Sequence, residues 1–135
     1  MRTSMLSLSV AAMGFAILVT PVRAHHAFAA EFDEHKPVTL TGTVKKVEWA
    51  NPHARFYIDA KNDKGVVVNW NFELGSPNGL MRLGWSRNSL KIGSVITVVG
   101  TLAKNSPYVG NASTVTLEGG KRLFAGSSEG DSTTP

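Results

Sequence analysis

Apolar and polar residues alternate along three successive stretches of the chain, with the period of two that is typical of strands half-buried in a sheet. These stretches are residues 38–49 (VTLTGTVKKVEW), 54–60 (ARFYIDA) and 66–74 (VVVNWNFEL). The tight turn sequence Asn62 to Gly65 separates the last two stretches. The alternation slips near Lys45, because Val44 and Val47 can share a face only if a β-bulge lies between them. The pattern therefore predicts a three-stranded antiparallel meander.

The second half of the chain predicts one short helix and two further strands. Ser76 and Pro77 are typical of an N-cap and a first helical residue, so we expect a short helix over residues 78–85. Residues 95–100 and 108–117 then predict a fourth and a fifth strand. This order of elements is the order of an OB-fold, a partly open five-stranded barrel. We therefore predict a mainly β, small OB-fold-like five-stranded antiparallel barrel with one short helix between strands 3 and 4. Another antiparallel α+β sheet is the alternative.

The first 24 residues have the pattern of a secretory signal peptide. A positive start at Arg2 and an apolar run from Leu6 to Val19 precede small residues at Val22 and Ala24. The run is shorter than the roughly 20 residues that a helix needs to span a bilayer. We therefore expect cleavage after Ala24, a periplasmic or secreted protein, and no stable membrane insertion after cleavage; a retained anchor is the alternative.

Three parts follow the predicted signal peptide of residues 1–24. We expect an N-terminal arm over residues 25–37, an OB-like β-barrel domain over 38–125 and a disordered polar tail over 126–135. In the arm, Phe28 and Phe32 are four residues apart, so one helical turn would place both rings on the core.

Charge and cysteine content exclude several classes of protein. The chain has 14 Lys+Arg and 10 Asp+Glu; Arg2 and Arg23 leave with the signal peptide, so the net charge falls from +4 to +2. So small a charge argues against nucleic acid as a partner. Because the chain has no cysteine, it has no disulfide framework, thiol nucleophile or thiolate metal site. No catalytic motif stands out, and we expect a binding module rather than an enzyme.

All four histidines lie within residues 25–53: His25, His26, His35 and His53. Cleavage after Ala24 would give His25 a free α-amine beside its imidazole, and a second imidazole would complete a three-nitrogen set that suits copper. His53 follows the Asn51-Pro52 turn and is the partner that we expect from the barrel. His26 is an alternative or third ligand. The sequence thus predicts a site for copper or another divalent metal at His25, His26 and His53; the alternatives are a solvated terminus and a histidine that only bonds a turn.

A second hypothesis uses aromatic side chains instead of histidines. Trp49, Trp85 and Tyr108, with Arg55 at the edge, would form a face of the barrel on which the rings of an envelope glycan stack or a protein binds. The competing interpretation is that tryptophans of alternating strands belong to the core.

Several blocks of the chain resemble a family of short exported bacterial proteins of unknown function. The resemblance is carried by residues 25–33 (HHAFAAEFD), 36–54 (KPVTLTGTVKKVEWANPHA), 73–85 (ELGSPNGLMRLGW), 89–100 (SLKIGSVITVVG) and 115–128 (VTLEGGKRLFAGSS). His25 and His26 match the histidine pair of the family pattern, and His53 matches its Asn-Pro-His. Arg55 and Phe56 depart from the aromatic and aliphatic residues usual there. The resemblance implies a single exported domain and no assigned activity.

Overall fold

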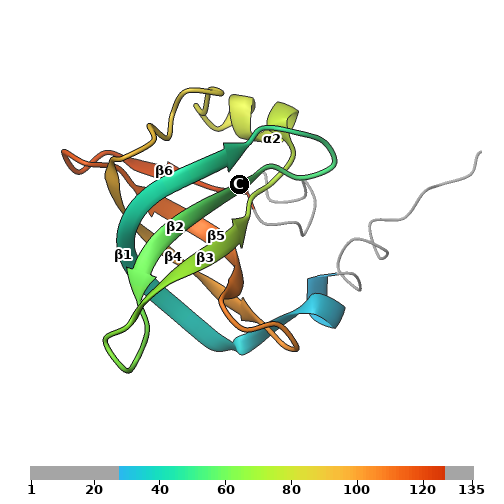
Figure 1. The fold of residues 1–135 in the computed structure, drawn as a ribbon. Helices are drawn as coiled ribbons and strands as arrows, with labels where there is room; N and C mark the ends of the chain where they lie inside the picture. The colour runs from blue at the N-terminus through green and yellow to red at the C-terminus, as the bar shows by residue number, and fades with distance from the viewer. Residues whose placement is uncertain (1–27, 127–135) are drawn as a thin grey trace, which may run out of the picture.

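The computed structural model describes residues 28–126 as a mainly antiparallel sheet of six strands with few helices (Figure 1). The strands are β1 (Phe32–Glu48), β2 (Arg55–Lys61), β3 (Val67–Glu73), β4 (Val95–Ala103), β5 (Val109–Thr116) and β6 (Arg122–Phe124). The helix α2 (Pro77–Arg82) lies between β3 and β4, and residues 28–31 form one helical turn before β1. The predicted signal peptide, His25, His26 and residues 127–135 lie outside the described residues.

Five of the strands close into a ring. β1 pairs with β4 through its first half and with β2 through its second, β2 pairs with β3, and β4 pairs with β5, all antiparallel. A parallel pairing of β3 with β5 completes the circuit, and β6 pairs with β5. β1 passes from β4 to β2 at Thr43, which pairs with both strands. The preceding residue, Gly42, lies so close to β2 that a Cβ atom there would be 2.5 Å from the Asp59 carbonyl oxygen. Only glycine permits that approach.

The alternation seen in the sequence separates the inside of the ring from its outside. On β3, Trp70 and Phe72 are buried inside, where the Phe72 ring stacks on Phe56 at a centroid distance of 5.6 Å. Asn69 and Asn71 occupy the other face of the strand. The predicted bulge is confirmed, since the register of β1 against β2 shifts between Val44 and Lys46.

The second half of the predicted N-terminal arm belongs to a strand. β1 begins at Phe32, six residues before the predicted strand, and Phe32 is 2% exposed and opposite Ala103 of β4. The expected helical turn is present, and it brings the Phe28 and Phe32 rings to 5.2 Å. The Lys104 amide also donates to the Glu31 carbonyl at 2.9 Å. The arm extends the sheet because these contacts satisfy its backbone groups and bury its aromatic side chain.

Helix α2 begins as the sequence predicts and ends early. Ser76 is the N-cap, its hydroxyl accepts from the Gly79 amide at 3.2 Å, and Pro77 follows it. The helix stops at Arg82 because Gly84 takes a φ of 93°, which continues no right-handed helix. Within residues 28–126, no helix is both long enough and apolar enough to cross a membrane.

Candidate functional site

The loop between β1 and β2 is held against the end of β3, and this contact positions His53. The Ala54 amide donates to the Gly75 carbonyl at 3.0 Å, and the Leu74 amide donates to the Ala54 carbonyl at 2.8 Å. Both bonds are made by Ala54, the residue after His53, and they hold His53 beside the last residue of β3. That residue is Glu73.

Glu73 is a carboxylate buried on the outer face of the sheet. It is 3% exposed, although it alternates with the polar residues of β3 rather than with the core residues. His53 Nδ1 lies 3.0 Å from one carboxylate oxygen, and Arg55 Nη2 donates to the other at 2.6 Å. Arg55 is also the register partner of Glu73 on β2, and its second amino group lies 3.5 Å from the Asn71 side-chain oxygen. The imidazole and the guanidinium therefore both cover the carboxylate, and the guanidinium of Arg55 balances its charge.

The surroundings of Glu73 act on its pKa in opposite directions. The pKa of the Glu73 carboxyl is raised above its usual value, because burial raises it by more than the charges of His53 and Arg55 lower it. The carboxylate of Glu31, in the turn before β1, is close enough to raise the pKa of Glu73 further. With two donors aimed at it, Glu73 is best satisfied as an ionised acceptor, so His53 Nδ1 carries the proton. The Nε2 lone pair of an imidazole that is 36% exposed is then left for another partner.

A second carboxylate on the same outer face, that of Glu48, is 38% exposed and serves as a comparison. Lys46 donates to Glu48 at 2.5 Å, and the Tyr57 hydroxyl donates to the other oxygen of Glu48 at 3.3 Å. The hydrogen bond from Lys46 lowers the pKa of Glu48, and the same bond raises the pKa of Lys46. This pair is an exposed salt bridge, whereas the Glu73 cluster is covered.

The structure places only one of the three predicted metal ligands. His53 lies in the Glu73 cluster, and His25 and His26 lie outside the described residues. His35, the fourth histidine, has a side chain that is 87% exposed beside Glu34. Over residues 28–126, no three His, Cys, Asp or Glu side chains come together as a group that could hold a metal ion.

The four residues of the aromatic hypothesis do not share one exposed face. Trp85 is 4% exposed, and its indole donates to the Phe124 carbonyl at 2.6 Å. Tyr108 is 40% exposed, has a φ of 58° and packs edge-on against Trp70 at 5.0 Å. Trp49 packs against the core while partly buried, and Arg55 belongs to the Glu73 cluster.

Sequence reasoning missed Glu73 and Asn71 as members of the site. The sequence placed Glu73 at the end of a strand without fixing what lay beside it. The register of the β2–β3 hairpin was the available signal, because it sets Arg55 opposite Glu73 and Tyr57 opposite Asn71. Using that signal requires the length of the turn to be known to within one residue.

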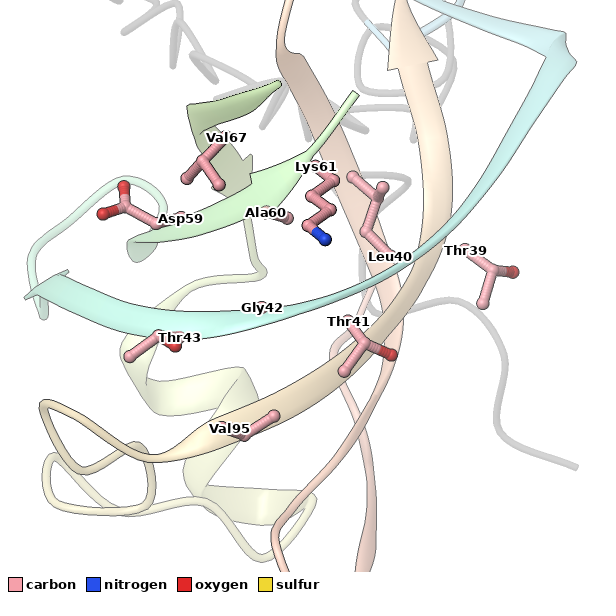
Figure 2. A pocket seen from close by; sticks show the side chains of 10 residues that line it. All are labelled: Thr39, Leu40, Thr41, Gly42, Thr43, Asp59, Ala60, Lys61, Val67 and Val95. Carbon is pink, nitrogen blue, oxygen red and sulfur yellow. The ribbon is translucent and has the colours of Figure 1, made fainter. Parts of the chain in front are cut away.

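A shallow groove lies where β1 leaves β2 and turns toward β4 (Figure 2). It encloses about 380 Å³ and is lined by Thr39, Leu40, Thr41, Gly42, Thr43, Asp59, Ala60, Lys61, Val67 and Val95. Asp59 accepts from the Asn69 amide group at 2.9 Å and lies 3.8 Å from the Lys45 amine. The carboxylate of the groove is thus already partnered, and hydroxyl and aliphatic groups make up most of the remaining lining.

Comparison with known proteins identifies a family but no activity. A family model described as a family of unknown function (DUF6152) matches residues 14–112 of the chain. No curated protein matches the chain.

Proposed function

The chain belongs to this family of unknown function, and we propose that it is an exported metal-binding module of the periplasm or of the secreted fraction. It binds copper or another divalent ion through Nε2 of His53 and through the mature N-terminus, His25, with His26 as an alternative or third ligand. The contact between His53 Nδ1 and the buried carboxylate of Glu73, at 3.0 Å, carries the proposal.

A histidine that ligates a metal through one ring nitrogen usually donates the proton of the other to a carboxylate or a carbonyl group. That bond fixes the tautomer, holds the plane of the ring and makes the ligating nitrogen more basic. Glu73 supplies this partner to His53, and Arg55 holds Glu73 from the other side at 2.6 Å. A histidine that only capped a turn would need neither a buried carboxylate as its partner nor an arginine that holds this carboxylate.

The N-terminal arm supports the second half of the proposal. The turn before β1 is tied to Lys104, and the Glu31 charge acts on Glu73. His25 lies six positions before Glu31, and six residue steps of extended chain span up to about 20 Å. A mature N-terminus at His25 is therefore within chain reach of the imidazole of His53. An α-amine and two imidazoles form a nitrogen donor set for which copper(II) has the highest affinity among the common divalent ions.

The ring of strands is, in this proposal, a barrel of the OB type. Three features support this: the spatial order of the strands, a helix between β3 and β4, and a parallel contact between β3 and β5. By analogy with that fold, ligands bind on the face of strands 2 and 3 and at the loops between strands 1 and 2 and between strands 4 and 5. His53 lies in the first of these loops, and Glu73 lies on that face.

Copper titration of the protein exported from its own precursor tests the proposal. Mass spectrometry first establishes whether the chain begins at His25. We expect a dissociation constant of about 1 nM for Cu(II). We expect His53→Ala and one extra residue ahead of His25 each to weaken binding about 100-fold or more, and Glu73→Gln to weaken it about 10- to 100-fold.

His35→Ala is the matched control, because its imidazole is exposed and belongs to the same arm. This variant should bind copper as the wild type does. Weak binding that responds to neither His53→Ala nor the added residue would contradict the proposal and would leave a solvated His-His terminus as the only binder.

The alternative function, an interaction module for envelope glycans or proteins, draws on Tyr108. This side chain is exposed beside Trp70, and its left-handed backbone is a conformation that functional sites often retain. The alternative predicts that tryptophan fluorescence responds to glycan fragments and not to copper, and that Tyr108→Ala removes the response. A response to copper alone would exclude it.

A further inference from the structure

Large apolar side chains remain exposed on the part of the molecule that carries α2. Met81 and Leu83, at the end of this helix, are 52% and 46% exposed, and Ile92, in the connection to β4, is 65% exposed. Phe124 of β6 is 63% exposed. Grouped exposure of this kind is typical of a surface that contacts something other than water.

The segments that carry these four side chains are joined by contacts. The Trp85 indole donates to the Phe124 carbonyl, and a Cβ atom on Gly126 would lie 3.4 Å from Leu83 Cδ1. The start of β4, just after Ile92, lies beside the β5–β6 hairpin, since Thr97 pairs with Thr116 and Thr116 pairs with Arg122. In Figure 1, α2, its connection to β4 and the β5–β6 turn all lie toward the upper end of the ring. We name these segments, residues 81–94 and 117–124, the α2 end.

Positive charge is concentrated in the same segments. Residues 28–73 contain 7 acidic and 6 basic residues, whereas residues 74–126 contain 1 acidic and 6 basic residues. Five of those six basic residues belong to the α2 end: Arg82, Arg87, Lys91, Lys121 and Arg122. Arg87, Lys91, Lys121 and Arg122 are exposed and form no ion pair with any described residue. The small net charge of the chain therefore conceals a strongly basic face.

We propose that the α2 end docks on the surface of a bilayer that contains anionic phospholipids. Aliphatic and aromatic side chains enter the boundary between headgroups and acyl chains, while Lys and Arg pair with the phosphates around them. A nucleic acid would share the phosphate chemistry. Its bases, however, stack on aromatic rings, whereas three of the four exposed apolar side chains here are aliphatic.

Docking in this way leaves the protein peripheral and sets its orientation. The carbonyl of Gly75 accepts a hydrogen bond from the amide of Ala54 in the β1–β2 loop, and Gly75 directly precedes the N-cap of α2. The loop that carries His53 is thus next to the docked end, and the β2–β3 hairpin points away from it (Figure 1). The proposal goes beyond the metal site and does not depend on it.

Vesicle flotation of the metal-free protein, recovered after export from its precursor, tests the docking surface. Vesicles of phosphatidylcholine alone are compared with vesicles of phosphatidylcholine and phosphatidylglycerol. We expect binding to the anionic vesicles only, with a loss at high salt. The double variant Lys91→Glu, Lys121→Glu should weaken partitioning about tenfold or more, since each basic residue near such a surface contributes about fivefold.

The matched control carries the same change of charge on the β2–β3 hairpin, Lys61→Glu with Lys64→Glu, and should bind as the wild type does. For the apolar side chains, Ile92→Ser with Phe124→Ser should weaken binding several-fold, whereas Val66→Ser, which replaces a side chain 55% exposed on that hairpin, should not. Circular dichroism establishes that each variant is folded.

Three results would overturn the proposal. These are absence of binding to anionic vesicles, equal losses in the two lysine double variants, and indifference to Ile92→Ser with Phe124→Ser. Light scattering without lipid adds a fourth: a dimer that the Ile92 and Phe124 substitutions dissociate would assign the face to a second copy of the chain.

Discussion

At the scale of single residues, burial separates two carboxylates that occupy the same outer face of the sheet. Glu48 and Glu73 each bond two donors. Glu48 keeps 38% of its side chain exposed and bonds an exposed lysine, and such surface pairs contribute little to stability. Glu73 has lost its water, so it depends on His53 and Arg55 to replace those hydrogen bonds. The same chemical group is therefore a surface feature in one place and a structural requirement in the other.

Replacing Glu73 by glutamine should cost about 1–3 kcal/mol of unfolding free energy, because the amide has one acceptor oxygen in place of the two that bond His53 and Arg55. Urea denaturation measures the loss. We also expect the tautomer of His53 to change, since the amide NH₂ of glutamine can donate to Nδ1 and leave the proton on Nε2. Nitrogen-15 NMR of the imidazole reports this directly.

Glu48→Gln is the control for that experiment. Its unfolding midpoint and its His53 tautomer should both match those of the wild type. A Glu73→Gln protein with unchanged stability and an unchanged tautomer would show that Glu73 does not orient the imidazole.

At the scale of elements, the sequence predicts the strands well and the hairpin register poorly. The alternation of Val67–Glu73 and the cap of α2 depend on neighbours in the sequence, so both could be inferred. The β2–β3 turn contains one residue more than a tight two-residue turn, because Asn62 closes it with Val66 and Gly65 takes a φ of 76°. One residue in a turn moves every partner across the sheet. The contact between Arg55 and Glu73 depends on the extra residue in this turn, so the cluster could not be predicted without knowing the length of the turn.

The sixth strand and the longer β1 were missed for a related reason. Both are short or irregular in sequence and become strands only because a neighbour offers hydrogen bonds: β5 for Leu123, and β4 for Phe32. Tertiary contacts of this kind leave no periodic signal.

Trp85 follows α2 and bonds β6 through its indole, so its substitution should destabilise both elements. Trp85→Phe removes the donor to the Phe124 carbonyl and part of a buried ring. We expect a loss of about 2 kcal/mol from the unpaired carbonyl and the space left behind. Hydrogen exchange should show the loss of protection first at Leu123 and Ala125. Uniform loss across the ring would contradict a local fastening role.

Gly100 allows β4 to run against β5 at the irregularity in their pairing. A Cβ atom there would lie 2.0 Å from the Asn111 carbonyl oxygen, a backbone atom that cannot move alone. Gly100→Ala should therefore destabilise the protein by about 2 kcal/mol or more. Gly79→Ala, within α2, would meet only side-chain atoms, the Ser76 hydroxyl at 3.1 Å and an Arg82 amino group at 4.0 Å, and thermal unfolding should show little change. Equal effects of the two substitutions would argue against the close strand contact.

At the scale of the whole molecule, one core and no cysteine imply that the ring unfolds as a unit. Trp70 lies inside the ring, Trp85 lies beside β6, and Trp49 follows β1. Urea transitions followed by tryptophan fluorescence and by far-ultraviolet circular dichroism should coincide. Their common slope should be about 1–3 kcal/mol per molar urea. An early fluorescence transition that leaves the dichroism unchanged would mean that α2 and β6 detach before the ring opens.

The parallel contact of β3 with β5 also determines when the chain can fold. A chain that emerges from its N-terminus, from a ribosome or through a membrane, exposes β1 first, but the ring closes only through residues 109–111. Before β4 has emerged, β1 lacks one of its two partner strands. Before residues 109–111 have emerged, the ring lacks the seam that β3 and β5 form. Closure of the ring is therefore a late step for such a chain, because the seam between β3 and β5 can form only once residues 109–111 are available.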